Sequence, residues 1–355
     1  LQIMTYNNEK LGTPILFDNT DIAAVMTQFK AVDYHEPFVL PGKDGEVKIE
    51  FYDAGHIFGS VFAVIDAEGK RVVFSGDIGN VNVPILRETE SLPGNIDVLV
   101  CESTYGDRLH ETNEKRQEVI ERMVSDAISH GGVLMIPSFS LERTQELIYD
   151  LNDLIDRKKK LPHVPIFLDS PLAIGATKVY RKYVSYYDEK AKKLVENGDD
   201  LFEFPGLTMC ETKEESIRIN QVPAPKMIIA GAGMMTGGRI VHHAKRYLSD
   251  DKSTLLIIGY QAAGTLGRRI LEGESPVMIY GEQIPVRCHI DAIGALSAHG
   301  DQKKLLDWIG GGNTLPKKVC LNHGEPLAAE GLAERVKEEF GVDASIASFG
   351  MSIEV

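Results

Sequence analysis

The stretches Asp53-Ala54-Gly55-His56 and Ser75-Gly76-Asp77 each place a Gly beside a residue that can bind a metal ion. Two later stretches repeat this arrangement, Ser297-Ala298-His299-Gly300-Asp301 and Asn322-His323-Gly324-Glu325. Gly lacks a Cβ atom, so it allows backbones to approach closely at a crowded site. Zinc accepts imidazole nitrogen and carboxylate oxygen as ligands, and a carboxylate can bridge two ions. Together the four stretches predict a metal site at the carboxyl ends of strands.

The segments around these stretches predict a β-rich region that is interrupted by an α/β insertion. Residues 47–101 show alternating patterns and short apolar runs, which are typical of strands. Over residues 132–271 a unit of apolar strand, small-residue loop and helix occurs four times, which predicts a parallel sheet. A β-rich pattern returns after Gly273, with one strand expected over residues 284–290. We therefore divide the chain into residues 1–109, an insertion over residues 110–295, and residues 296–355.

Composition limits the class of protein. With 355 residues, 43% of them apolar and 25% charged, the chain is long enough for two globular domains. No apolar run reaches the roughly 18–20 residues that cross a bilayer, so no membrane partner is expected. The net charge of −14 argues mildly against a nucleic-acid partner. It does not exclude a nuclease, because metal ions and a few local basic groups can supply a positive field inside a cleft.

The cysteines point to a reducing, cytoplasmic location. None of the four shows C-x-x-C spacing, so neither a disulfide framework nor a cysteine zinc site is expected. Three of them lie in or beside apolar runs, which predicts buried thiols: Cys101, Cys288 and Cys320.

Taken together, the motifs resemble in order and spacing the metallo-β-lactamase superfamily, and specifically its β-CASP nucleases. That family includes the endonuclease subunit of the pre-mRNA 3′-end cleavage factor and bacterial and archaeal ribonucleases. The resemblance covers nearly the whole chain from about Phe51 onward. It implies an α/β fold, namely a metallo-β-lactamase αββα sandwich, N-terminally incomplete here, with an inserted parallel-sheet β-CASP domain.

The resemblance also implies roles for individual residues. His56 matches a ligand of one zinc ion, Asp77 a carboxylate that bridges two zinc ions, and His323 a ligand of the second ion. Glu102, in Cys101-Glu102-Ser103-Thr104-Tyr105-Gly106, matches the acidic residue peculiar to the β-CASP branch, and His299 matches its proposed general acid. The resemblance therefore implies a zinc-dependent ribonuclease that acts in RNA processing or decay as an endonuclease, and it leaves open an additional 5′-exonuclease activity.

One family motif, H-x-H-x-D-H, has no match in residues 1–52. His56, Asp77 and His323 alone are too few for two four-coordinate zinc ions. The chain also begins with Leu1. We therefore expect this chain to be an N-terminally truncated piece of an active enzyme rather than a degenerate paralogue. By itself, this piece is expected to bind zinc weakly and to be inactive.

The loops that follow the strands of the insertion predict contacts to RNA phosphates, since α/β sheets bind ligands at this edge. The alternative is that these residues are ordinary helix caps and tight turns. Phosphate contacts carry little sequence specificity. RNA is favoured over DNA because the DNA-repair branch usually carries Val at the position of His323. The candidates are Ser138, Arg143, Thr236, Gly237, Thr265 and Arg268.

Two other functions are considered. One is a catalytically inactive RNA-binding or scaffold paralogue, which an upstream H-x-H-x-D-H motif would exclude. The other is a small-molecule hydrolase of the same fold, such as a thioesterase or lactamase, which needs no inserted lobe over residues 110–295. The sequence leaves open whether the protein forms a homodimer.

Overall fold

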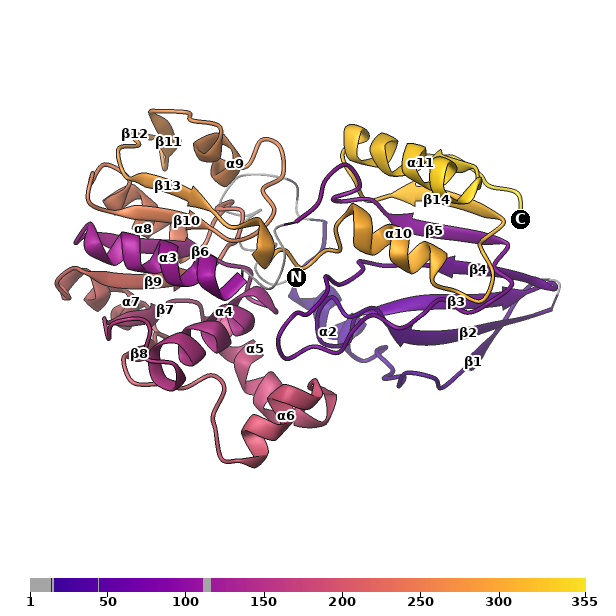
Figure 1. Cartoon of the computed structure of the whole chain (residues 1–355), viewed down its shortest axis with the longest axis horizontal. Coiled ribbons are helices and arrows are strands. Elements are labelled where there is room, and N and C mark those ends of the chain that lie inside the picture. The colour runs from indigo at the N-terminus through magenta and orange to yellow at the C-terminus, as the bar shows by residue number, and fades with distance from the viewer. Residues whose placement is uncertain (1–13, 15, 44, 111–115) are drawn as a thin grey trace.

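The computed structural model describes residues 14, 16–43, 45–110 and 116–355, which form two lobes (Figure 1). The first lobe combines residues up to 110 with residues from 297 onward, and the second lobe lies between them in the chain. A β-rich region split by an α/β insertion is therefore present. The exact domain boundaries stay a prediction.

A seven-stranded mixed sheet forms the centre of the first lobe, in the order β1-β2-β3-β4-β5-β14-β15. Strands β1 to β4 pair antiparallel, whereas β4, β5, β14 and β15 run parallel. Strand β14 lies directly beside β5, although the whole second lobe separates them in the chain. The strands are β1 (Phe38–Pro41), β2 (Glu46–Asp53), β3 (Val61–Ala67), β4 (Lys70–Phe74), β5 (Val98–Glu102), β14 (Lys318–Asn322) and β15 (Ala344–Ile346).

Helices α10 (Gln302–Gly310) and α11 (Pro326–Phe340) pack on one face of this sheet. Strand residues such as Phe62 and Leu99 are fully buried against Trp308 and its apolar neighbours. Residues that point to the other face are less covered, and Phe74 is 45% exposed. A metallo-β-lactamase sandwich pairs two sheets, and the described residues supply one of them.

The second lobe contains a six-stranded sheet whose strands are all parallel, in the order β13-β10-β6-β9-β7-β8. The parallel sheet expected from the repeated units is therefore present. Its strands are β6 (Val133–Pro137), β7 (Ile166–Leu168), β8 (Leu207–Met209), β9 (Lys226–Ala230), β10 (Thr254–Ile257) and β13 (His289–Ala292).

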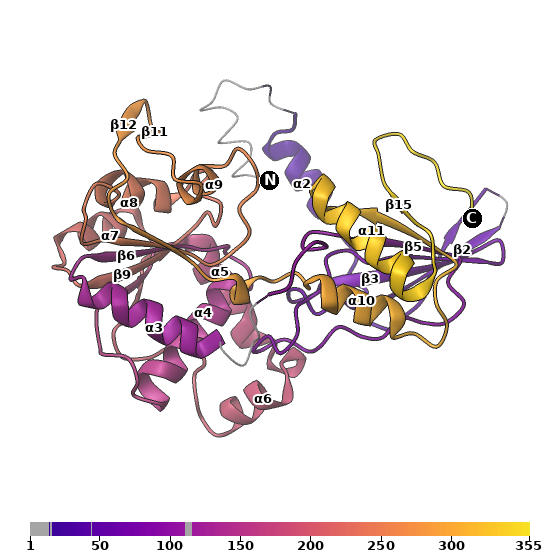
Figure 2. The same ribbon diagram turned by 45° about the horizontal axis from the view of Figure 1, so that its top comes forward.

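Both faces of this sheet are buried, which explains why its strands are continuous apolar runs. Leu134 and Ile136 of β6 pack into one core, and Val133 and Met135 pack into the other. Figure 2 shows the helices on the two faces. They are α3 (Arg116–Ser129), α4 (Arg143–Asn152), α5 (Pro171–Lys182), α6 (Glu189–Glu196), α7 (Lys213–Arg218), α8 (Arg239–Tyr247) and α9 (Leu266–Leu271).

The prediction of one continuous strand over residues 284–290 is wrong. A hairpin of β11 (Val277–Ile279) and β12 (Glu282–Ile284) ends there, and β13 begins at His289. Pro285 interrupts the run, because proline has no N–H to donate to a ladder. Helix α2 (Asn19–Met26) precedes the first sheet. None of the described helices is long and apolar enough to cross a membrane.

Candidate active site

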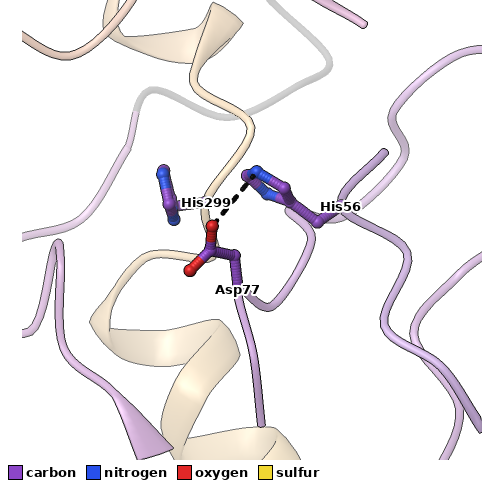
Figure 3. Close-up of side chains that lie close together, drawn as sticks. All are labelled: His56, Asp77 and His299. Atoms are coloured by element: carbon purple, nitrogen blue, oxygen red, sulfur yellow. Dashed lines mark ion pairs between the residues drawn. The ribbon is translucent and has the colours of Figure 1, made fainter. Parts of the chain in front are cut away.

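Loops that follow strands of the first sheet bring three predicted metal ligands together. His56 follows β2, Asp77 follows β4 and His323 follows β14. Asp77 lies between the two histidines: its Oδ2 is 3.8 Å from His56 Nε2 and its Oδ1 is 3.3 Å from His323 Nδ1. His299 lies beside His56 and Asp77 (Figure 3). The structure thus gathers the four residues that the short stretches singled out.

The loop that carries His56 is held by its own polar side chains. Asp53 Oδ1 accepts from the Gly55 N–H at 2.8 Å, and Ser60 Oγ accepts from the His56 N–H at 3.1 Å. Gly55 has φ +65°, and a Cβ there would lie 2.7 Å from the Thr89 nitrogen, so this position requires Gly.

Burial, followed by the charges of His299 and Arg143, lowers the pKa of His56 to about 3. The ring is therefore neutral at physiological pH, and a neutral imidazole is the form that binds a metal. Its Nδ1 atom is buried and has no hydrogen-bond partner among the residues that the structure describes.

His323 is fixed by the loop that follows β5. Thr104 Oγ1 donates to the His323 carbonyl at 3.0 Å and lies 3.3 Å from its Nδ1. The next residue, Gly324, packs so closely that a Cβ would lie 2.4 Å from Ser103 Oγ. The Asn-His-Gly-Glu stretch thus needs its Gly for close packing against the β5 loop.

Glu102, which is buried, and His299, which is half-buried, form a pair beside these residues. Glu102 Oε2 lies 3.1 Å from His299 Nδ1, and Glu102 Oε1 accepts from the Ile78 N–H at 2.5 Å. Burial alone would raise the pKa of Glu102, but the charge and hydrogen bond of His299 and the Ile78 N–H lower it. Burial alone would lower the pKa of His299, but the Glu102 carboxylate raises it. The pair therefore favours an imidazolium beside a carboxylate.

A cavity of about 1060 Å³ opens between the lobes at these side chains. The first lobe contributes the predicted ligands and His299, and the second lobe contributes the loops after β6, β9 and β10 and the start of α5. Most of the residues with which the second lobe lines the cavity are apolar or are glycines that offer only backbone. The apolar ones include Phe139, Leu172 and Met234. Arg143 is the cationic side chain from the second lobe on this wall.

The donor set fits zinc. Ligand atoms of His56, Asp77 and His299 lie within 4.8 Å of one another, as do those of Glu102, His299 and His323. His299 already uses Nδ1 for Glu102, which leaves His56, Asp77 and His323 as the natural ligands. Imidazole nitrogen and carboxylate oxygen are donors that zinc accepts, although these three residues alone are too few for two four-coordinate ions.

Two of the predicted RNA contacts have their polar groups engaged inside the protein. Arg143 is 4% exposed, and its Nη1 donates to Glu146 Oε2 at 2.8 Å and to the Leu296 carbonyl at 2.7 Å. Ser138 is 1% exposed, and its Oγ accepts from Thr144 Oγ1 at 2.9 Å. Arg143 still lines the cavity, and its Nε has no hydrogen-bond partner.

The other four predicted RNA contacts do not line the cavity. Thr265 caps α9, since its Oγ1 accepts from the Arg268 N–H at 3.3 Å, and Arg268 Nε donates to Glu272 at 2.6 Å. Thr236 is exposed and Gly237 half-buried on the loop after β9. Contact of these residues with phosphates stays a prediction.

Several cavity residues were missed from the sequence. Phe139 follows β6, Tyr260 follows β10, and Glu325 belongs to the fourth stretch but received no role. Their position at the carboxyl ends of parallel strands was a signal that could have found them.

Comparisons with known proteins agree with this site. Residues 144–270 match the Beta-Casp domain family, and residues 283–347 match the family described as Zn-dependent metallo-hydrolase RNA specificity domain. A ribonuclease of Thermus thermophilus is 35% identical over 100% of this chain and 79% of that relative. An RNase J-like protein of Methanocaldococcus jannaschii is 34% identical over 87% of this chain and 70% of its own length. The cleavage and polyadenylation specificity factor 73 of Drosophila melanogaster is 28% identical over 93% of this chain and 47% of its own length.

The resemblance is confirmed, and the chain belongs to the β-CASP family of the metallo-β-lactamase superfamily.

Proposed function

We propose that this chain belongs to a zinc-dependent ribonuclease that hydrolyses RNA phosphodiester bonds in RNA processing or decay, as an endonuclease, with an additional 5′-exonuclease activity left open. The observation that carries the proposal is the position of Asp77 between His56 and His323, with His299 beside them. The matched zinc-dependent RNA specificity family and the relatives named as ribonucleases support it.

His56, Asp77 and His323 would hold part of a site for two zinc ions, with Asp77 lying between the two histidines, and the H-x-H-x-D-H motif would supply the remaining ligands. Zinc bound there supplies Lewis-acid polarisation of a phosphoryl oxygen. The neutral ring of His56 is ready to bind without losing a proton, because its pKa is lowered to about 3.

His299 would protonate the leaving oxygen. Its Nδ1 contacts Glu102, so its Nε2 is the atom that can carry the proton to the substrate. Glu102 would orient the ring and keep it protonated, since the carboxylate raises the pKa of His299. Glu102 does not line the cavity and therefore acts through His299.

RNA would be held mainly through its phosphates, with little base specificity. Of the six predicted contacts, Thr236, Gly237, Thr265 and Arg268 stay candidates outside the cavity, whereas Ser138 and Arg143 are buried and hydrogen-bonded within the protein. A cytoplasmic location is also proposed, and four buried free thiols support a reducing compartment. Homodimer formation stays a prediction that sedimentation can test.

A catalytically inactive RNA-binding scaffold is the less favoured alternative. A scaffold has no need for a bridging carboxylate between two imidazoles, or for a buried Glu102 that raises the pKa of His299. A small-molecule hydrolase has no use for the second lobe, whose loops form one wall of the cavity.

The test compares hydrolysis of single-stranded RNA, single-stranded DNA and a β-lactam by zinc-loaded protein that carries an H-x-H-x-D-H motif ahead of residue 1, and by the 355-residue chain alone. We expect RNA cleavage by the protein that carries the motif, which EDTA abolishes and which His323→Ala reduces by at least about 100-fold. Robust cleavage by the chain alone would show that the metal site is misplaced. His163→Ala is the matched control, since His163 is exposed and outside the cavity. RNA binding without cleavage would favour the scaffold, and β-lactam turnover alone would overturn the proposed substrate.

A further inference from the structure

A second, smaller cavity of about 270 Å³ begins at the loop that carries His56. Ile57 of this loop lines the active-site cavity, and the next two residues, Phe58 and Gly59, line the smaller one. Consecutive Cα atoms are about 3.8 Å apart, so the Cα atom of Gly59 lies within about 11 Å of that of His56. A ligand bound in the smaller cavity would therefore lie close to the predicted metal site.

Aromatic side chains from both lobes line this smaller cavity. Tyr34 and Phe58 belong to the first lobe, and Tyr183 and Tyr186 follow α5 in the second lobe. The rings of Tyr34 and Tyr183 each meet that of Tyr186 at a steep angle, with centroids 6.4 and 6.2 Å apart. Tyr183 is 42% exposed and Tyr186 is 37% exposed, so a ligand from solvent can reach both rings. We call these four residues the aromatic pocket.

Cations lie over the tyrosines of the aromatic pocket, whereas its lining carries a negative charge. The Arg87 guanidinium is 5.7 Å from the centroid of the Tyr186 ring, and the Lys182 ammonium is 5.3 Å from that of Tyr183. Asp33 is the charged residue among those described that line the pocket, and its Oδ1 accepts from the Tyr186 hydroxyl at 3.4 Å. The lining thus disfavours a phosphate, whereas the two exposed cations favour a phosphate beside the pocket.

We propose that the aromatic pocket binds one nucleobase of the RNA strand, a few nucleotides from the phosphate that is cleaved, while Arg87 and Lys182 contact the phosphates beside that base. The inference rests on the proposed ribonuclease function. A base presents a flat face on which tyrosine rings can stack, and its neighbouring phosphates attract cations. An apolar peptide could occupy the rings as well, but it would make no use of the two cations or of the nearby active site.

A base held in the aromatic pocket would set the register of the strand. Phosphate contacts alone let a strand shift by one nucleotide, because every phosphate offers the same group. Stacking on aromatic side chains strengthens binding by about 5- to 150-fold per base and tolerates all four bases. The bond that reaches Asp77 would therefore lie a fixed number of nucleotides from the base in the pocket, whatever the sequence.

A stable abasic nucleotide tests the pocket, because it keeps the phosphates of the strand but has no base to stack. End-labelled oligouridines, each with one abasic nucleotide at a different position, are cleaved by zinc-loaded protein that carries the H-x-H-x-D-H motif. In wild type we expect one bond, at a constant number of nucleotides from the abasic position, to be cut at least about 5-fold less than in the intact RNA. This weakly cut bond should move along the series in step with the abasic nucleotide.

Variants of the aromatic pocket should remove this pattern. In Tyr183→Ala/Tyr186→Ala the difference between abasic and intact RNA at that bond should fall below about twofold, whereas Tyr183→Phe/Tyr186→Phe keeps both rings and the pattern. Tyr280→Ala is the matched control, since Tyr280 is 57% exposed and lies outside the pocket. Even cutting near the abasic nucleotide in wild type, or the wild-type pattern in the double alanine variant, would overturn the pocket.

Fluorescence of 2-aminopurine separates the pocket from the function on which it rests. This fluorescent base replaces one uracil of a phosphorothioate oligouridine, which resists cleavage, at each position in turn. Stacking on a tyrosine ring quenches the base, so we expect wild type to quench it more strongly than Tyr183→Ala/Tyr186→Ala at equal occupancy by RNA. Equal quenching by the two proteins at every position would overturn the pocket. A complete lack of cleavage of unmodified RNA would instead overturn the ribonuclease.

Discussion

The ring of Phe58 lies parallel to that of Tyr180, with centroids 4.0 Å apart and 3° between the planes. Phe58 belongs to the loop that carries His56, and Tyr180 belongs to α5 of the other lobe. One stacked pair thus joins a predicted metal ligand to the β-CASP lobe.

Phe58→Ala should lower the free energy of unfolding by about 2 kcal/mol, less than the 3–5 kcal/mol of a fully buried Phe, because Phe58 is half-buried. Zinc affinity should fall about tenfold, since the His56 loop loses a support. Phe58→Leu keeps most of the volume and should cost about 1 kcal/mol, the stacking contribution. Denaturant unfolding and zinc titration measure both effects. Unchanged zinc affinity in Phe58→Ala would contradict a supporting role for the stack.

Glu102→Ala should reduce RNA cleavage less than His323→Ala, because Glu102 acts through His299 whereas His323 is a predicted metal ligand. We expect about 10- to 100-fold loss for Glu102→Ala. Measured zinc content should fall in His323→Ala and stay normal in Glu102→Ala. Equal and mild losses of activity in both variants would argue against these assignments.

Arg143→Ala should act mainly on stability. Glu146 is fully buried and pairs with both Arg143 and Arg116, so removal of Arg143 leaves a buried carboxylate with one partner. The free energy of unfolding should fall by about 3 kcal/mol or more. Arg122→Ala, at an exposed position of α3, is the neutral control. Two results together would instead identify Arg143 as a phosphate contact. Stability would be unchanged in Arg143→Ala, and the slope of log RNA affinity against log salt concentration would be smaller by about one.

Asp53 should make stability depend on pH below neutrality. Burial, with a smaller contribution from the Glu90 charge, raises the pKa of Asp53 from 3.8 to about 6, while the Gly55 N–H opposes the rise. Between these two pKa values the folded protein binds more protons than the unfolded chain, so stability falls as pH rises from about 4 to about 6. Above about pH 6 both states are ionised and the slope disappears.

Asp53→Asn should remove this contribution while an amide oxygen still accepts from the Gly55 N–H. The stability of Asp53→Asn relative to wild type should therefore increase across that pH interval and then level off. Urea unfolding at several pH values measures it, and Asp126→Asn, at an exposed position, is the control. A relative stability that does not change with pH would contradict the raised pKa of Asp53.

Short local patterns were enough to predict the parallel sheet and the residues that meet at Asp77. Apolar runs such as 226–230 predict strands covered on both faces, and His56, Asp77 and His323 follow strands whose ends share one edge. The burial of Arg143 could not be predicted, because Asp150 and Arg116 complete its charge network only after α3 packs on α4. Contacts between lobes, such as that of Tyr260 with Glu325, depend on packing that no local pattern encodes.

The pairing of β5 with β14 sets the order in which the site can form during synthesis. Asn322 lies opposite Glu102 in this pairing, yet the entire β-CASP lobe is translated between them. His56, Asp77 and Glu102 leave the ribosome well before His299 and His323, so the nascent chain carries half of the site for as long as the second lobe takes to appear. Contacts of such high sequence separation form slowly. Nuclease activity should therefore arise only after β14 has docked, when translation of both lobes has finished.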